Sequence, residues 1–202
     1  MSHALWYASR ATGLVCLLLL SASVVLGLLG AGRFSTASWP RFVVGALHRN
    51  VSLLIVVFLA VHISTAIIDP YAGIGWISAV VPFSSSYHPL WIGLGAVAFD
   101  LLLALIVTSL LRTRLSLRLW RAVHWTAYAC WPAALVHGIG IGGTDRTQPW
   151  VLALDLVAVG SVLVALGFRL VASHPDTAAR GTQAATTAGS KAGTRAGTSW
   201  RS

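Results

Sequence analysis

Four histidines occupy two long apolar segments that are almost free of charged residues. His48 and His62 lie in LHRNVSLLIVVFLAVH, and His124 and His137 lie in HWTAYACWPAALVH. An imidazole in hydrocarbon is costly unless its nitrogens are used, so a histidine inside a membrane favours a functional interpretation. Two pairs on two segments therefore predict two metal centres, each held from two sides. The iron of a haem, which has two axial positions, suits such a pair.

The composition of the chain indicates the class of fold that must position these histidines. Of its 202 residues, 56% are hydrophobic and 9% are charged, whereas a soluble domain carries about 25% charged residues. We therefore expect an all-α, polytopic membrane helix bundle with no second folded domain. The net charge of +9 raises nucleic acid as a partner, but the basic residues flank apolar segments, so membrane topology explains them better and no nucleic-acid partner is expected. Cys16 and Cys130 fall within apolar segments and are interpreted as buried small hydrophobic residues.

Five apolar segments are long enough to cross a bilayer, for which a helix needs about 20 residues. They are residues 5–31, 42–68, 90–111, 119–139 and 150–171. Glycine, proline and serine interrupt the segment 71–89, which is expected to be an interfacial loop with one short helix. The last part of the chain is rich in Ala, Gly, Thr and Ser, which predicts a disordered tail. The expected organisation is a transmembrane domain at 1–172 and a cytoplasmic tail at 173–202.

The distribution of the basic residues gives the expected orientation in a cell membrane. All of the 14 basic residues except Arg10 and Arg146 fall on one side of the five segments. The positive-inside rule assigns that side to the cytoplasm. The N-terminus is then expected outside and the C-terminus inside.

This topology also predicts how the histidines pair. The second and fourth segments run in the same direction, so His48 is expected near His124 on the cytoplasmic side and His62 near His137 on the outer side. A separation of 14 residues places His48 and His62 on one face of a helix in a left-handed bundle. A separation of 13 residues leaves His124 and His137 about 140° apart at about 100° per residue. A kink at Pro132 is expected to correct this difference.

Two arginines are predicted to bind the cofactor through its propionates. Arg49 follows His48 directly, and Arg10 lies near the outer end of the first segment, where other arginines are scarce. The alternative for each is a topology-determining arginine whose charged end reaches the membrane surface. Asp100, near the middle of the third segment, is a candidate for a proton-transfer or hydrogen-bonding role. Its alternative is a polar partner on a neighbouring helix.

The two histidine spacings, together with HR at 48–49, IDPY at 68–71 and HG at 137–138, resemble the ferric reductase-like transmembrane domain family. This family includes ferric reductases, NADPH oxidases and the haem-binding membrane subunit of the bacterial periplasmic methionine sulfoxide reductase. The resemblance covers about residues 5 to 171 and implies two b-type haems, held by the pairs His48–His124 and His62–His137. The spacing of 13 residues is usual in the family. Many members have a sixth span, so the first helix here is expected to match their second.

No Gly-rich phosphate-binding turn follows an expected strand, so a flavin or nicotinamide domain is not expected within this sequence. The resulting hypothesis is an oxidoreductase membrane component that passes electrons from a cytoplasmic donor to an extracytoplasmic acceptor. The donor would be a separate flavoprotein or a quinol. Two alternatives remain open. One is a non-catalytic haem-binding membrane subunit or assembly factor, and the other is a proton or metal transporter that uses the intramembrane histidines.

Overall fold

The computed structural model describes residues 4–32, 34, 36 and 39–172. Within this part of the chain every regular element is a helix. In order these are α1 (Ala4–Ala31), α2 (Arg41–Ile68), α3 (Trp76–Val80), α4 (Pro89–Leu110), α5 (Leu117–His124), α6 (Ala127–Ile141), the 3-10 helix η1 (Gly143–Thr147) and α7 (Pro149–Ala172). Helices α1, α2, α4 and α7 are each long and apolar enough to cross a membrane. The expected all-α membrane bundle is therefore confirmed, whereas the expected tail at 173–202 lies outside the described residues.

Prolines and small polar residues mark the ends of these helices. Pro40 precedes α2, while Pro89 and Pro149 are the first residues of α4 and α7, positions at which a missing backbone N–H costs nothing. The hydroxyl of Ser116 accepts the Leu119 N–H at the start of α5. Helix α2 ends before Asp69, whose extended backbone is the geometry that a following proline requires.

The segment expected to form a single fourth span is instead two helices, α5 and α6. They meet at Trp125 and Thr126, where the Thr126 N–H donates to the Val123 carbonyl three residues earlier, and the Thr126 hydroxyl donates to the same carbonyl at 2.7 Å. Such bonds tighten the helix locally into a 3-10 turn. Pro132 lies inside α6 and does not separate the two helices; the break in this segment falls nearer to His124.

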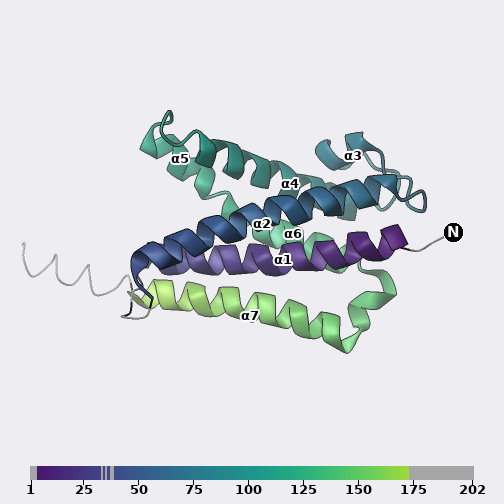
Figure 1. Ribbon diagram of the computed structural model, residues 1–202. Coiled ribbons are helices and arrows are strands. Elements are labelled where there is room, and N and C mark those ends of the chain that lie inside the picture. Colours follow the sequence, from purple (N-terminus) through teal and green to yellow (C-terminus); the bar gives the residue numbers. More distant parts are fainter. Residues whose placement is uncertain (1–3, 33, 35, 37–38, 173–202) are drawn as a thin grey trace, which may run out of the picture.

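The chain passes five times along the bundle, with α5 and α6 together making the fourth pass (Figure 1). One end of the bundle, which we call the α3 end, holds the start of α1, the helix α3 and η1 (Figure 1). The other end, which we call the α5 end, holds the start of α2, the helix α5 and the end of α7. Helix α1 packs against α2, α6 and α7, and α4 packs against α6. The short helix α3 lies in the connection that was expected to be interfacial, and it packs on α4.

A buried apolar cluster joins four helices in the middle of the bundle. Its members are Leu20, Ile55, Ala98, Leu105 and Cys130. Ile55 lies seven residues from both His48 and His62 on α2, so the cluster lies between the two histidine levels. Trp131 packs against the cluster and donates its indole N–H to the hydroxyl of Ser21 at 2.8 Å. This layer of closely packed side chains separates the two ends of the bundle.

Candidate metal centres

The structure brings the four histidines together in the two predicted pairs. The ring centroids of His48 on α2 and His124 on α5 lie 6.4 Å apart, with an interplanar angle of 64°. The ring centroids of His62 on α2 and His137 on α6 lie 6.3 Å apart, with an interplanar angle of 81°. The first pair lies toward the α5 end and the second toward the α3 end.

These separations suit two imidazoles that share one metal ion. A transition metal binds an imidazole nitrogen at about 2 Å, and the ring centre lies about 1 Å further away, so two opposed ligands have centroids about 6 Å apart. Among the residues that the structure describes, no three His, Cys, Asp or Glu residues form a group that could hold a metal ion. Each pair therefore offers two protein ligands only. Two axial imidazoles fit a metal whose other four ligands belong to a macrocycle, as in haem.

Three of the four imidazoles are oriented by a backbone carbonyl. The Nδ1 atom of His48 lies 3.0 Å from the Ser23 oxygen, and that of His62 lies 2.7 Å from the Ser9 oxygen. The Nδ1 atom of His137 lies 2.7 Å from the oxygen of Trp91 on α4. A carbonyl can only accept, so Nδ1 carries the proton in each ring and Nε2 keeps its lone pair. This is the hydrogen bonding that usually supports metal-ligating histidines.

A glycine stands four residues after each of these accepting residues, at Gly13, Gly27 and Gly95. In an α-helix the carbonyl of residue i points toward residue i+4, so a ring that approaches this carbonyl passes close to residue i+4. A Cβ at Gly13 would lie 2.9 Å from a ring atom of His62, and one at Gly95 would lie 2.7 Å from a ring atom of His137. At Gly27 the corresponding distance is 3.6 Å, an ordinary contact. The absence of a side chain is therefore required at the first two positions.

We call these arrangements the carbonyl–glycine sites. They are Ser9/Gly13 for His62, Ser23/Gly27 for His48 and Trp91/Gly95 for His137. The sequence interpretation missed them, although a signal was present. The pattern Ser-x-x-x-Gly at 9–13 recurs at 23–27, and this shift of 14 residues equals the separation of His48 and His62. Two antiparallel helices, α1 and α2, thus carry matched repeats that meet at both levels.

His124 is the exception among the four. Its Nδ1 atom is buried and has no hydrogen-bond partner among the described residues. The ring instead stacks on Trp120, one turn earlier in α5, with centroids 4.7 Å apart and planes inclined by 21°. The guanidinium of Arg112 lies 4.9 Å from the centroid of the Trp120 ring. The pair at the α5 end is therefore supported by the protein on the His48 side only.

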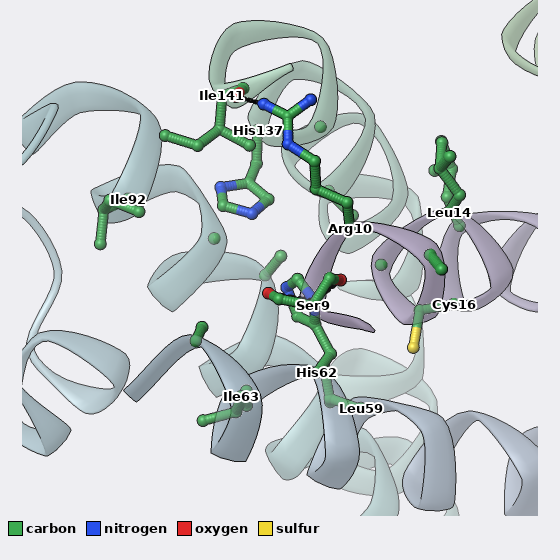
Figure 2. A pocket seen from close by; sticks show the side chains of 18 of the residues that line it. Ser9, Arg10, Leu14, Cys16, Leu59, His62, Ile63, Ile92, His137 and Ile141 are labelled. Carbon is green, nitrogen blue, oxygen red and sulfur yellow. Dashed lines mark hydrogen bonds between the residues drawn. The ribbon is translucent and has the colours of Figure 1, made fainter. Parts of the chain in front are cut away.

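A cavity of about 530 Å³ opens between His62 and His137 at the α3 end. Most of its walls come from α1, α2, α4 and α6, with further residues from α3, η1 and α7, and both histidines line it together with Arg10 (Figure 2). Pockets for small molecules and cofactors commonly have volumes of about 300–1,000 Å³. The two glycines that would otherwise meet the histidine rings, Gly13 and Gly95, also line this cavity. The site at the α3 end thus combines two opposed nitrogen ligands with space for a bound group.

Arg10 lines this cavity and joins α1 to the end of α6. Its Nη1 atom donates to the Gly142 carbonyl at 2.6 Å and to the Asp145 carboxylate at 2.8 Å. Its Nη2 atom donates to the Ile141 carbonyl at 2.9 Å (Figure 2). The guanidinium also lies 4.2 Å from the Trp6 ring centroid. The last carbonyls of a helix lack partners within it, so Arg10 caps α6. The sequence interpretation did not foresee Asp145 as the partner of Arg10, because the two are 135 residues apart.

The other predicted polar residues have fewer contacts. Arg49 is exposed on α2, next to His48, and no hydrogen bond or ion pair joins it to the described residues. Asp100 is partly buried on α4 and likewise has no hydrogen-bond partner in the described part of the chain. Asp155 of α7 lines the cavity at the α3 end. Of the two predicted cofactor-binding arginines, only Arg10 therefore lies in a defined network.

Opposed imidazoles at two levels within a bundle of apolar helices define a class, multi-pass membrane proteins with paired intramembrane histidines. The family described as ferric reductase like transmembrane component matches residues 12–135, and the chain belongs to this family. The matched residues include His48, His62 and His124, and they end two residues before His137. No curated protein and no solved structure matches the chain. Membership of the family indicates a membrane component of electron transfer.

Proposed function

We propose that this protein transfers electrons across the cell membrane through two b-type haems. His48 and His124 would hold one, and His62 and His137 the other. The observation that carries the proposal is the opposition of each pair, with ring centroids 6.4 and 6.3 Å apart. The carbonyl–glycine sites add support, because they leave Nε2 of three rings available as a ligand. A bound haem supplies one-electron redox chemistry through its iron.

The protein residues would hold and separate these two centres. Fourteen residues along α2 correspond to a rise of about 21 Å, which fits within a hydrocarbon core of about 30 Å. The apolar cluster around Ile55 lies between the two levels and excludes water from the middle of the bundle. Three of the four imidazoles keep the proton on Nδ1 through the hydrogen bond to a carbonyl, which leaves Nε2 as the nitrogen available for a metal. The chain thus provides ligands, orientation and a water-poor environment at two depths.

The proposed direction of transfer runs from a cytoplasmic donor to an extracytoplasmic acceptor. The α5 end carries most of the basic residues in the described part of the chain, and the α3 end carries few. Those at the α5 end are Arg41, Arg49, Arg112, Arg114, Arg118, Arg121 and Arg169. This asymmetry favours the α5 end as the cytoplasmic face, with the N-terminus outside and the C-terminus inside. We propose a separate flavoprotein or a quinol as the donor.

We also propose that Arg10 and Arg49 bind haem propionates. Arg10 lines the cavity between His62 and His137, where part of its guanidinium remains free beside the bonds to Asp145 and the α6 carbonyls. Arg49 is exposed beside His48 and has no competing partner among the described residues. Guanidinium groups favour carboxylates because their N–H groups match two oxygens at once.

The decisive experiment is to purify the protein in detergent and measure the haem per chain by pyridine haemochrome assay. The expected result is two b-type haems. His62→Ala and His137→Ala should each lose the haem of the α3 end, and His48→Ala and His124→Ala the haem of the α5 end. His88→Asn is the matched control, because His88 has a left-handed backbone (φ 42°) that asparagine tolerates. It should retain both haems.

The outcome also separates the alternative functions. A protein without any haem spectrum would overturn the proposal and favour a transporter that uses its histidines for protons or metal ions. A protein whose dithionite-reduced haems are not reoxidised by ferric chelates, quinones or oxygen would favour a non-catalytic haem-binding subunit. Reoxidation by one of these acceptors would support electron transfer and identify the class of acceptor.

A further inference from the structure

The two histidine pairs differ in how firmly the protein holds them. In the pair at the α3 end, both rings donate to carbonyls at 2.7 Å. In the pair at the α5 end, His48 donates to the Ser23 carbonyl at 3.0 Å, and its own carbonyl accepts from the Ser52 hydroxyl at 2.7 Å. The fourth ring, that of His124, has a buried Nδ1 without a partner among the described residues. One ligand position of the four therefore lacks support.

The carbonyl–glycine pattern that serves His137 on α4 does not recur further along that helix. Fourteen residues beyond Trp91 and Gly95, the corresponding positions are Leu105 and Ser109, so no glycine opens the helix surface. The nearby Thr108 hydroxyl donates to the Ala104 carbonyl at 2.7 Å and to the Leu105 carbonyl at 3.3 Å. These two carbonyls thus accept a side-chain hydroxyl within α4 itself.

The position of His124 in the chain also allows it to move. It is the last residue of α5, and the 3-10 turn at Trp125 and Thr126 follows directly, whereas the other three histidines lie within α2 or α6. An open pocket of about 300 Å³ is lined by Trp120, on whose ring His124 stacks, together with Arg112 and Leu117. The indole N–H of Trp120 is also buried without a partner. Open space and an unsatisfied indole N–H therefore occur together at Trp120, the ring that His124 contacts.

We propose that the site at the α5 end binds a small external diatomic ligand in place of His124, while the site at the α3 end does not. This inference rests on the proposed function, since it requires a haem at each pair. The exchange breaks one metal–nitrogen bond and forms one metal–ligand bond, with no net transfer of electrons or protons. His48 would stay bound as the protein ligand, because the Ser23 carbonyl holds its ring. The site would thus accept a neutral π-acceptor ligand at the position that His124 leaves.

The test uses carbon monoxide on the dithionite-reduced protein in detergent, after the haem content has been measured. The wild type, with two haems in each chain, is expected to bind about one carbon monoxide per chain. The double variant His62→Ala/His137→Ala should keep one haem and still bind carbon monoxide. The double variant His48→Ala/His124→Ala should keep one haem and bind none. Binding of none or of two by the wild type would overturn the inference, as would binding by the second double variant alone.

A second variant keeps the inference testable if the double variants do not fold. Gly13→Ala would place a Cβ 2.9 Å from the His62 ring and disturb its bond to Ser9, so this change should make the α3 end exchangeable and raise the carbon monoxide bound per remaining haem from about one half toward one. Gly30→Ala is the matched control on the same helix, because a Cβ there meets nothing within 4 Å. Equal binding by both variants and the wild type would overturn the inference. A wild type without haem would instead overturn the proposed function.

Discussion

Ser9 and Arg10, which are consecutive on α1, hold opposite sides of one histidine pair. The Ser9 carbonyl accepts the Nδ1–H of His62 at 2.7 Å, and the Arg10 guanidinium caps the helix that carries His137. Because α1 packs on both α2 and α6, this short stretch couples the two ligands of the α3 end to one rigid element. The distance between the rings therefore depends on residues that are not ligands themselves.

Removal of the Arg10 guanidinium should loosen the α3 end. Arg10→Met deletes one ion pair with Asp145 and two bonds to the carbonyls of Ile141 and Gly142. A hydrogen bond to a charged group contributes about 1.5–3 kcal/mol, and partial exposure of this group reduces the gain, so we expect a loss of about 2 kcal/mol in unfolding free energy. Thermal unfolding in detergent measures it. Arg146→Met is the control at the same end and should change stability little, whereas equal losses would contradict the capping role.

Alanine in place of each glycine should weaken haem binding more, the closer the added Cβ lies to a histidine ring. Alanine stabilises a helix by about 1 kcal/mol relative to glycine, so Gly30→Ala, with open space around it, should raise the melting temperature slightly. Gly13→Ala and Gly95→Ala should weaken the haem of the α3 end, because the new Cβ would lie 2.9 and 2.7 Å from the histidine rings. Gly27→Ala, at 3.6 Å, should be tolerated. Haem content after gel filtration gives the order, and a loss with Gly27→Ala that equals the others would contradict it.

Much of the fold and the pairing of the histidines could be predicted from the sequence for physical reasons. Apolar segments of membrane-spanning length favour helices, because a single helix satisfies its own backbone hydrogen bonds within hydrocarbon. The parallel course of the second and fourth passes then places His48 beside His124 and His62 beside His137, and the structure brings these pairs together. The ligation itself remains a prediction.

Other features could not be predicted, because they depend on contacts between distant segments. No glycine or proline marks the turn at Trp125 and Thr126, where both residues keep helical backbone angles. The bonds of Arg10 join segments more than 130 residues apart. The pairs are unequally supported because His137 has a carbonyl partner on α4, whereas His124 has no hydrogen-bond partner for Nδ1 among the described residues. A hydrophobicity pattern carries no such information.

The orientation in the membrane can be tested with reporter fusions. The loop at residues 111–116 and the C-terminus should lie in the cytoplasm, and the loop around Gly73 should lie outside, since the basic residues gather at the α5 end. A reporter that fluoresces only in the cytoplasm should be active when it is fused at residues 111–116 or at the C-terminus. A phosphatase that is active only in the periplasm should be active when it is fused near Gly73. The opposite pattern at all three positions would reverse the proposed direction of electron transfer.

The turn between α5 and α6 should determine the register of the pair at the α5 end. A 3-10 turn advances about 120° per residue and an α-helix about 100°, so the bonds at Thr126 rotate His124 in the direction that reduces the mismatch of about 140° over 13 residues. Insertion of one alanine after Trp125 would rotate α5 by about 100° relative to α6. His137 stays in place because α6 packs on α4 and α1, so the insertion should remove one haem and leave the other. An alanine inserted after Thr113, in the preceding loop, should retain both, and retention of both haems in the first variant would show that the turn does not fix the register.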